Sequence, residues 1–320
     1  MSTEARPVDA TSPDIASRHG SATGFVPPEP ALADFHTHTL RSDGILTPAG
    51  LVAAVAANGV RLLAITDHDT LAGVRELRAS GETPAGLEVV PGIEINTVVL
   101  DRDHVLEGEV HILGIGVDPD DDALEAALAR QRDARRLRFE KMVGKLRDLG
   151  MPIEAALETL PATTDEDALG RPRVARALIA AGHAASVEDA FNRHLSRGRA
   201  AYVSREGLGP QEAIGAIRAA GGLASLAHYS EASDHLGFLS ELVDMGLNGL
   251  EVHYRAFDPG TVRTMRRIAT DHRLVWTGGT DYHGDRETYA EAHAQLWNPA
   301  EVAAGIADAL GWSAGKPATE

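Results

Sequence analysis

The sequence contains no cysteine, few aromatic residues and no long apolar run. Without cysteine there is no disulfide, no thiolate nucleophile and no cysteine-ligated zinc or iron–sulfur site. No stretch approaches the roughly 20 apolar residues that a bilayer-spanning helix needs, so we expect no membrane segment. Positive charge is also scarce, because 30 Lys and Arg face 47 Asp and Glu, which gives a formal net charge of −17. We therefore expect no binding to duplex DNA or to an anionic membrane, and an anionic substrate needs a local source of positive charge.

What the chain does have is length and histidine. Its 320 residues are 43% hydrophobic and 24% charged, which are the proportions of a soluble globular protein. The 14 histidines become the main candidates for chemistry. Residues 1–30 are rich in Ser, Thr, Ala and Pro and lack an apolar signal-peptide core, so we expect a disordered leader and a cytoplasmic protein. Residues 313–320 are expected to form a short tail.

Short apolar segments alternate with amphipathic stretches over residues 31–119 and again over residues 199–312. Examples of the apolar segments are Arg61–Thr66, Leu223–Ala227 and Gly249–His253. This alternation predicts parallel βαβ units and an α/β sheet or barrel. Residues 120–198 show only helical periodicity, including one long helix over Ala123–Leu149. We interpret this block as an all-helical insertion that serves as a lid or substrate domain.

Histidine occurs twice in the first expected strand. His36 and His38 are one residue apart, so on a strand both imidazoles point to the same face and can chelate one ion. Asp43 follows on the loop after that strand. Taken alone, the pair fits two ordinary half-buried histidines equally well.

Other expected strands also carry His, Asp or Glu in or just after their apolar segments. These residues are Asp67, His68, Asp69, Glu94, His111, His228, Asp281 and His283. A single histidine such as His111 is more often a core residue than a ligand. Because the loops at one end of parallel strands converge, the whole set predicts a polynuclear metal site with His and carboxylate ligands.

In this order and spacing, the motifs resemble the polymerase and histidinol phosphatase (PHP) family of metallophosphoesterases, over about residues 34–284. The likeness is strongest to stand-alone members with a helical insertion, of the 3′,5′-nucleoside bisphosphate phosphatase type, some of which trim the 5′ ends of short RNAs. Two further motifs support it, Leu169-Gly170-Arg171-Pro172 before a helix and Ala201-Tyr202-Val203 after the insertion. The resemblance implies a distorted (β/α)7 barrel of the PHP type with an all-helical insertion domain.

The resemblance also implies two to three divalent metal ions, with Mn²⁺, Fe²⁺ and Zn²⁺ as candidates. The implied ligands are His36, His38, Glu94 and Asp281 for the first ion, Asp43, His68 and His283 for the second, and Glu94, His111 and His228 for the third. Among them, His38, Asp43, His68 and Asp281 are also assigned a catalytic role. A hydroxide that bridges two ions is the expected nucleophile. Asp69 and His253 are candidates for the acid that protonates the leaving group.

Arginines cluster in the expected insertion, and two interpretations of them remain open. The run in the long helix is either a solvated basic face or part of a phosphate clamp, since guanidinium groups match phosphate oxygens. The resemblance assigns substrate binding to Arg135, Arg136, Arg138, Arg171 and Arg173. Two departures from the family pattern leave substrate identity open: Arg173 replaces a usual His, and Tyr229 follows His228 where Pro is usual.

We therefore expect a hydrolase of phosphoric esters. Its expected substrates are phosphomonoesters of small nucleotides, such as 3′,5′-nucleoside bisphosphates, or short oligoribonucleotides trimmed from the 5′ end. Histidinol phosphate, a cyclic phosphate or a sugar phosphate is the alternative. A non-catalytic PHP module is a third possibility, but such modules usually lack several ligands, and all nine positions are filled here.

Overall fold

The computed structural model describes residues 27–99, 108–160, 169–284 and 287–312. The tail at 313–320 and nearly all of the leader, residues 1–26, lie outside the described residues. Seven strands form one sheet, in which the spatial order follows the chain order. The strands are β1 (Ala33–Asp34), β2 (Leu62–Ile65), β3 (Glu88–Val98), β4 (Glu109–Ile115), β5 (Leu223–Leu226), β6 (Gly249–Tyr254) and β7 (Val275–Gly279).

The sheet curves until its two edge strands meet. The backbone N–H of Phe35, just after β1, donates to the carbonyl of Gly278 in β7 at 3.1 Å. Further along, Thr37 forms a bridge with Tyr282, and the N–H of His38 donates to the Tyr282 carbonyl at 3.0 Å. The strands thus form a nearly closed seven-stranded barrel, which confirms the expected fold class.

One detail of the expected topology was wrong. Neighbouring strands are parallel except at β4, which is antiparallel to both β3 and β5. No helix lies between β3 and β4 among the described residues, and the two strands pair directly in opposite directions over seven residue pairs. The site end of β4 is therefore its beginning, where His111 lies.

Helices cover the barrel and form the segment between β4 and β5. Around the barrel lie α1 (Pro48–Ala57), α2 (Ala72–Ser80), α7 (Pro210–Ala219), the 3₁₀ helix η5 (Ser230–Ser233), α8 (Leu236–Asp244), α9 (Pro259–Asp271), α10 (Tyr289–His293) and α11 (Ala300–Ala309). Between β4 and β5, before α7, lie α3 (Asp122–Asp148), α4 (Glu154–Thr159), α5 (Arg171–Ala180), α6 (Val187–Ala190) and the π-helix η4 (Phe191–Leu195). Local sequence sets several starts: Thr47 caps α1 by accepting from the N–H of Gly50, and Asp121 caps α3 by accepting from that of Leu124.

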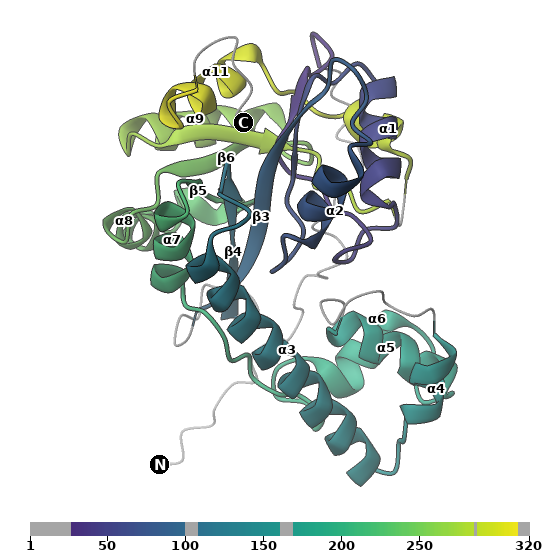
Figure 1. The fold of residues 1–320 in the computed structure, drawn as a ribbon. Helices are drawn as coiled ribbons and strands as arrows, with labels where there is room; N and C mark the ends of the chain where they lie inside the picture. Colours follow the sequence, from purple (N-terminus) through teal and green to yellow (C-terminus); the bar gives the residue numbers. More distant parts are fainter. Residues whose placement is uncertain (1–26, 100–107, 161–168, 285–286, 313–320) are drawn as a thin grey trace, which may run out of the picture.

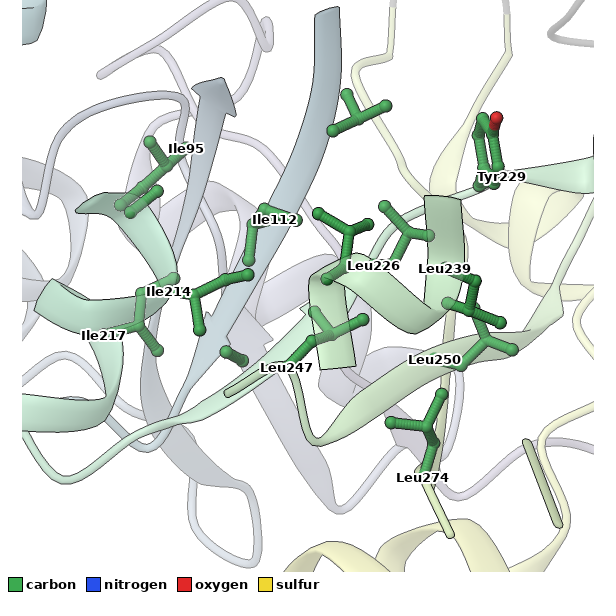
Figure 2. Packing of buried hydrophobic residues seen from close by; sticks show 14 of the residues in the cluster. Ile95, Ile112, Ile214, Ile217, Leu226, Tyr229, Leu239, Leu247, Leu250 and Leu274 are labelled. Atoms are coloured by element: carbon green, nitrogen blue, oxygen red, sulfur yellow. The ribbon is translucent and has the colours of Figure 1, made fainter. Parts of the chain in front are cut away.

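The largest hydrophobic cluster lies between the sheet and its covering helices. Figure 2 shows Ile112 of β4 and Leu226 of β5 beside Ile214 of α7, with Leu239 of α8 near Leu250 of β6. All five side chains are fully buried. Burial of these apolar faces fixes the strands that carry the polar site residues.

The long helix α3 extends from the barrel to a separate group of helices, α4, α5 and α6 (Figure 1). Leu124 and Leu128, near its start, belong to the barrel cluster, whereas Met142 and Leu146 belong to a second cluster with Leu178 of α5. α3 therefore contributes to two cores. The division of the chain at residues 119/120 and 198/199 into barrel and insertion stays our interpretation.

Across the described part of the chain, no helix combines the length and the apolar character that a membrane span requires.

Candidate metal centre

Three groups of His, Asp and Glu side chains lie at one end of the barrel. In each group, one donor atom per residue lies within 4.8 Å of the donor atoms of the others. The groups are His36, His38, Glu94 and Asp281; His38, Asp43, His68 and His283; and His68, Glu94 and His111. Because His38, His68 and Glu94 each belong to two groups, the three groups form one continuous cluster.

Glu94 of β3 lies at the centre of this cluster. Its Oε2 atom is 3.1 Å from Nε2 of both His36 and His38, and 3.2 Å from Nδ1 of His68. Its Oε1 atom is 2.8 Å from Nδ1 of His111 and 3.3 Å from Nε2 of His228. Each oxygen of one buried carboxylate thus faces a different set of imidazoles.

Asp43 and His283 extend the cluster toward solvent. Oδ1 of Asp43 is 3.1 Å from Nε2 of His283, and Oδ2 is 3.7 Å from Nε2 of His68. The Asp43 side chain is 48% exposed, whereas Glu94 is fully buried. The cluster therefore runs from the barrel interior to an accessible edge.

The backbone is strained at three positions of the site. Asp69, His228 and Asp281 have φ values of 52°, 31° and 51°, in the left-handed region that non-glycine residues rarely adopt. Asp69, His228 and Asp281 lie shortly after the ends of β2, β5 and β7, respectively. Such strain costs on the order of 1–3 kcal/mol per residue and persists where surrounding contacts enforce it, commonly at functional sites.

Buried carboxylates just beneath the cluster hold its loops. Asp67 accepts from the backbone N–H and the hydroxyl of Thr39, at 2.7 and 2.8 Å, and from the Ser42 hydroxyl at 2.8 Å. Asp34 accepts from the N–H and hydroxyl of Thr280 at 3.0 and 2.7 Å. These bonds fix the segments that carry His38, Asp43 and Asp281.

Charge within the cluster keeps its central carboxylates ionised. Burial opposes ionisation of Glu94, but the imidazoles of His68, His36 and His111 outweigh burial and hold the pKa of Glu94 well below its usual value. The pKa of Asp281 is likewise held well below its usual value, because His36 and His283 outweigh burial. Burial lowers the pKa of His68 to about 3 despite the attraction of Glu94. The neighbouring carboxylates raise the pKa values of His36, His38, His111 and His283 against burial, so a divalent cation that binds these imidazoles must displace protons.

Divalent metal ions fit this donor set. Within the described residues, both ring nitrogens of His38 and Nδ1 of His68 are buried without a hydrogen bond of acceptable geometry. Buried polar atoms are normally satisfied, so these nitrogens require a partner that the protein itself does not supply. Imidazole and carboxylate donors without thiolate suit Mn²⁺, Fe²⁺ and Zn²⁺.

The structure brings some of the expected substrate-binding arginines near this cluster. Arg135 of α3 pairs with Asp69, next to His68. Arg138 and Arg171 are buried, and both act electrostatically on Glu109, whose Oε2 lies 4.0 Å from Nε2 of His111. Arg205, which the sequence analysis did not single out, forms an ion pair with the same Glu109.

The other two arginines contact residues away from the cluster. Arg136 pairs with Asp133 and Glu140 of its own helix, at 3.1 and 3.5 Å. Nη2 of Arg173 donates to the carbonyl of Leu157 at 3.4 Å, inside the helical segment. Their substrate-binding role stays a prediction.

His253, one of two expected leaving-group acids, does not lie in the cluster. Its Nδ1 atom donates to the carbonyl of Trp297 at 2.6 Å, and its Nε2 atom accepts from Nε of Arg266 at 3.2 Å. A β-bulge between Glu251 and His253 turns the two side chains to different sides of β6. Asp69 does lie beside the cluster, where it accepts from the N–H of Asn96 at 3.1 Å and pairs with Arg135.

Sequence reasoning missed Glu251 of β6 altogether. This fully buried carboxylate accepts from Nδ1 of His36 at 3.0 Å and from the N–H of His228 at 2.7 Å. A charged residue inside the apolar segment Gly249–His253 was the signal that could have found it, because buried charges are retained only when they have partners.

Known proteins with similar sequences are phosphoesterases. The chain is 32% identical over 274 residues to the 5′-3′ exoribonuclease Rnm of Escherichia coli, covering 84% of this chain and 90% of that one. It is 30% identical to the 3′,5′-nucleoside bisphosphate phosphatase of Chromobacterium violaceum, covering 79% and 88% of the two chains. It is 31% identical to the phosphoribosyl 1,2-cyclic phosphate 1,2-diphosphodiesterase of Eggerthella lenta, covering 79% and 94%.

A solved structure agrees with these relatives. The chain aligns with a protein of Bifidobacterium adolescentis, assigned as a metal-dependent phosphoesterase, at a TM-score of 0.71 and 31% identity, covering 88% of this chain and 98% of that one. No protein-family model matches the chain. Fold, cluster and relatives together define a metal-dependent phosphoesterase, a hydrolase of phosphoric ester bonds. The chain belongs to the PHP family.

Proposed function

We propose that this phosphoesterase hydrolyses phosphomonoesters of small nucleotides that carry a second phosphate, such as 3′,5′-nucleoside bisphosphates, or trims short RNAs from the 5′ end. One observation carries the proposal: a group of buried and partly buried arginines lies beside the metal-ligand cluster. The group consists of Arg138, Arg171 and Arg205 around Glu109, with Arg135 on Asp69 next to it. A substrate with two anionic groups separated by a ribose matches two adjacent cationic sites.

Three guanidinium groups act on one carboxylate in the arginine group. Arg138, Arg171 and Arg205 all act on the single carboxylate of Glu109 and hold its pKa below the usual value against burial. Burial, together with the neighbouring Arg205 and Arg171, lowers the pKa of Arg138 to about 9. A bound phosphate offsets this crowding of guanidinium groups, and the bidentate geometry of guanidinium favours phosphate over other anions.

For the metal centre, we propose two to three divalent ions held by nine residues. The first would be held by His36, His38, Glu94 and Asp281, the second by Asp43, His68 and His283, and the third by Glu94, His111 and His228. When bound, such ions activate water at neutral pH and offset the charge of the phosphoryl group. His228 is 3.3 Å from Glu94, and its ring lies 5.0 Å from that of His111, which supports its place in the third set.

The residues of this chain then position the substrate and keep the site ionised. The half-exposed Asp43 marks the edge at which a phosphate ester can enter. Arg171 and Arg205 would hold the second phosphate, and thereby orient the ester that is cleaved. Relatives are named as a 5′-3′ exoribonuclease, a nucleoside bisphosphate phosphatase and a phosphoribosyl cyclic phosphate diphosphodiesterase, and the arginine group fits each of these substrates because each carries a second phosphate.

A substrate screen that follows the products by chromatography tests the proposal, because cleavage of RNA or of a cyclic phosphate breaks a diester and releases no inorganic phosphate. The chain, stripped with a chelator and reloaded with Mn²⁺, is assayed on nucleoside monophosphates, 3′,5′-bisphosphates, short 5′-phosphorylated RNAs, a cyclic ribose phosphate and histidinol phosphate. We expect no turnover without metal, and the highest kcat/KM on the bisphosphate or the short RNA. A highest kcat/KM on histidinol phosphate or on the cyclic phosphate would contradict the substrate assignment while leaving the metal assignment in place.

A further inference from the structure

We propose that Glu251 is a positioning residue that fixes the ring of His36 and the backbone of His228 in the arrangement that binds metal. Glu251 belongs to none of the three groups of candidate ligands. Its two oxygens instead have different partners: Oε1 accepts from Nδ1 of His36 at 3.0 Å, and Oε2 accepts from the N–H of His228 at 2.7 Å. The inference rests on the metal assignment of the proposed function.

The contact with His36 determines which ring nitrogen faces the site. Nε2 of His36 lies 3.1 Å from Oε2 of Glu94 and 3.3 Å from Oδ1 of Asp281, whereas Nδ1 faces Glu251. A neutral imidazole carries one proton, and an acceptor at Nδ1 holds the proton there. The lone pair of Nε2 is then directed at the ligand cluster. Carboxylates that accept from the second nitrogen of a ligating histidine commonly play this part in metal sites.

The contact with His228 stabilises a strained backbone. His228 has a φ of 31°, and its N–H is held by Glu251 in that conformation. The same residue places its Nε2 atom 3.3 Å from Oε1 of Glu94. One carboxylate on β6 therefore orients residues that face the two different oxygens of Glu94.

Glutamine at position 251 cannot hydrogen-bond to both partners and also leave Nε2 of His36 free to bind a metal. A backbone N–H can only donate, so the amide oxygen of glutamine must face His228 and the amide NH₂ must face His36. Nδ1 of His36 then has to accept, which moves the ring proton to Nε2 and blocks that nitrogen as a ligand. In the opposite amide orientation, the NH₂ group faces the N–H of His228. No hydrogen bond then forms to that N–H, and the loop that carries His228 is no longer fixed. Glu251→Gln is nearly isosteric, so its effect separates hydrogen-bonding polarity from packing.

The test uses Zn²⁺, which is diamagnetic, on the full chain. In the zinc-loaded wild-type protein, nitrogen-15 NMR of the histidine rings should show a protonated Nδ1 and an unprotonated Nε2 for His36, with its signals assigned by comparison with His36→Gln. In Glu251→Gln we expect that Nδ1–H signal to disappear and the zinc affinity, measured by competition with a chelating dye, to fall by about 10- to 100-fold.

Asp34→Asn is the matched control. Asp34 is also a fully buried carboxylate, and it accepts from the backbone N–H of His36 at 3.3 Å but does not contact its ring. We expect this variant to lower thermal stability and to keep the His36 Nδ1–H signal. Unchanged zinc affinity and an unchanged His36 ring signal in Glu251→Gln would overturn the inference. If Glu251→Gln does not fold, an Nε2-protonated His36 in the zinc-loaded wild type still overturns it. Failure of the wild-type protein to bind zinc contradicts the metal assignment instead.

Discussion

Oε1 of Glu94 lies 2.8 Å from Nδ1 of His111, across the antiparallel pair of β3 and β4. The other oxygen, Oε2, faces the rings of His36, His38 and His68. Glu94 therefore belongs to two of the three ligand groups, whereas His111 belongs to one. The two residues should differ in how much metal their loss removes.

Glu94→Gln should lower the bound metal by more than His111→Ala does. Glutamine offers one carbonyl oxygen and no charge, so both groups that include Glu94 lose an anionic donor, and turnover should fall by about 100-fold or more. His111→Ala should remove at most one ion and leave the His38, Asp43, His68 and His283 group intact. Elemental analysis after reconstitution with Mn²⁺ or Zn²⁺ measures the difference. Equal losses in the two variants would rule out Glu94 as the shared ligand.

Arg171→Ala should reduce kcat/KM for a 3′,5′-bisphosphate and leave p-nitrophenyl phosphate nearly unaffected. A lost charge-assisted contact of about 1.5–3 kcal/mol corresponds to a roughly 10- to 150-fold change. A simple aryl ester has no second phosphate, so it does not use that contact. Steady-state kinetics on the two esters, with metal content checked in each preparation, give the comparison.

Arg136→Ala is the contrasting variant for Arg171. Arg136 pairs with Asp133 and Glu140 on its own helix, and its side chain is 39% exposed. Exposed pairs of this kind contribute little to stability. We expect no change in kcat/KM for either ester, because we interpret this part of α3 as a solvated face. An equal loss in both arginine variants would contradict the placement of the second phosphate at Arg171.

The clustered His, Asp and Glu residues were predictable from sequence because each lies in or beside an apolar strand that the periodicity identifies. Residues beneath them were harder to find. Glu251 and His253 are two residues apart and should share a face of β6, but the bulge between them sends Glu251 toward His36 and His253 toward Trp297. A bulge leaves no unambiguous mark in a single sequence, so the position of His253 near a strand end did not indicate that its side chain lies outside the cluster.

Contacts between residues that are far apart in the chain were equally hard to predict from the sequence. Arg205 and Glu109 are far apart in the chain, and nothing local in either segment indicates that they form an ion pair. The same holds for Gln131 of α3, which donates to the carbonyl of Asn96 at 2.6 Å and accepts from the N–H of Leu208 at 2.8 Å. Helical periodicity predicted that α3 exists, but which of its polar residues meet the barrel depends on how the helix docks.

Gly279→Ala should destabilise the protein and weaken metal binding together. A Cβ atom at Gly279 would lie 2.4 Å from Cβ and 2.5 Å from the backbone nitrogen of His36, so β7 must shift away from the ligand strand. Overpacking of this kind costs about 1–3 kcal/mol. Urea unfolding and zinc titration of the purified variant measure the two effects.

Gly215→Ala is the matched control for Gly279. Gly215 lies within α7, and a Cβ atom there would meet no heavy atom of the described residues within 4 Å apart from its chain neighbours and the backbone of its own helix. Alanine in an exposed helix interior is favoured by about 0.5–1 kcal/mol over glycine, so stability should rise and metal affinity should not change. A Gly279→Ala variant as stable as Gly215→Ala would contradict the close approach of β7 to His36.

Acid should destabilise the barrel through His253, independently of the metal. Burial, with a smaller contribution from Arg266, lowers the pKa of His253 to about 4 from its usual 6.5. The unfolded chain therefore binds more protons than the folded chain between pH 6.5 and pH 4, so the free energy of unfolding falls as the pH falls through that window. Between pH 7 and pH 5 the expected contribution is about 2 kcal/mol. His253→Gln removes the titrating group and retains a donor for the Trp297 carbonyl, so the variant should lose less stability than the wild type over this range. Urea unfolding of metal-free wild-type and variant protein at pH 7 and pH 5 gives the difference, and equal losses in the two proteins would show that His253 does not titrate in this range.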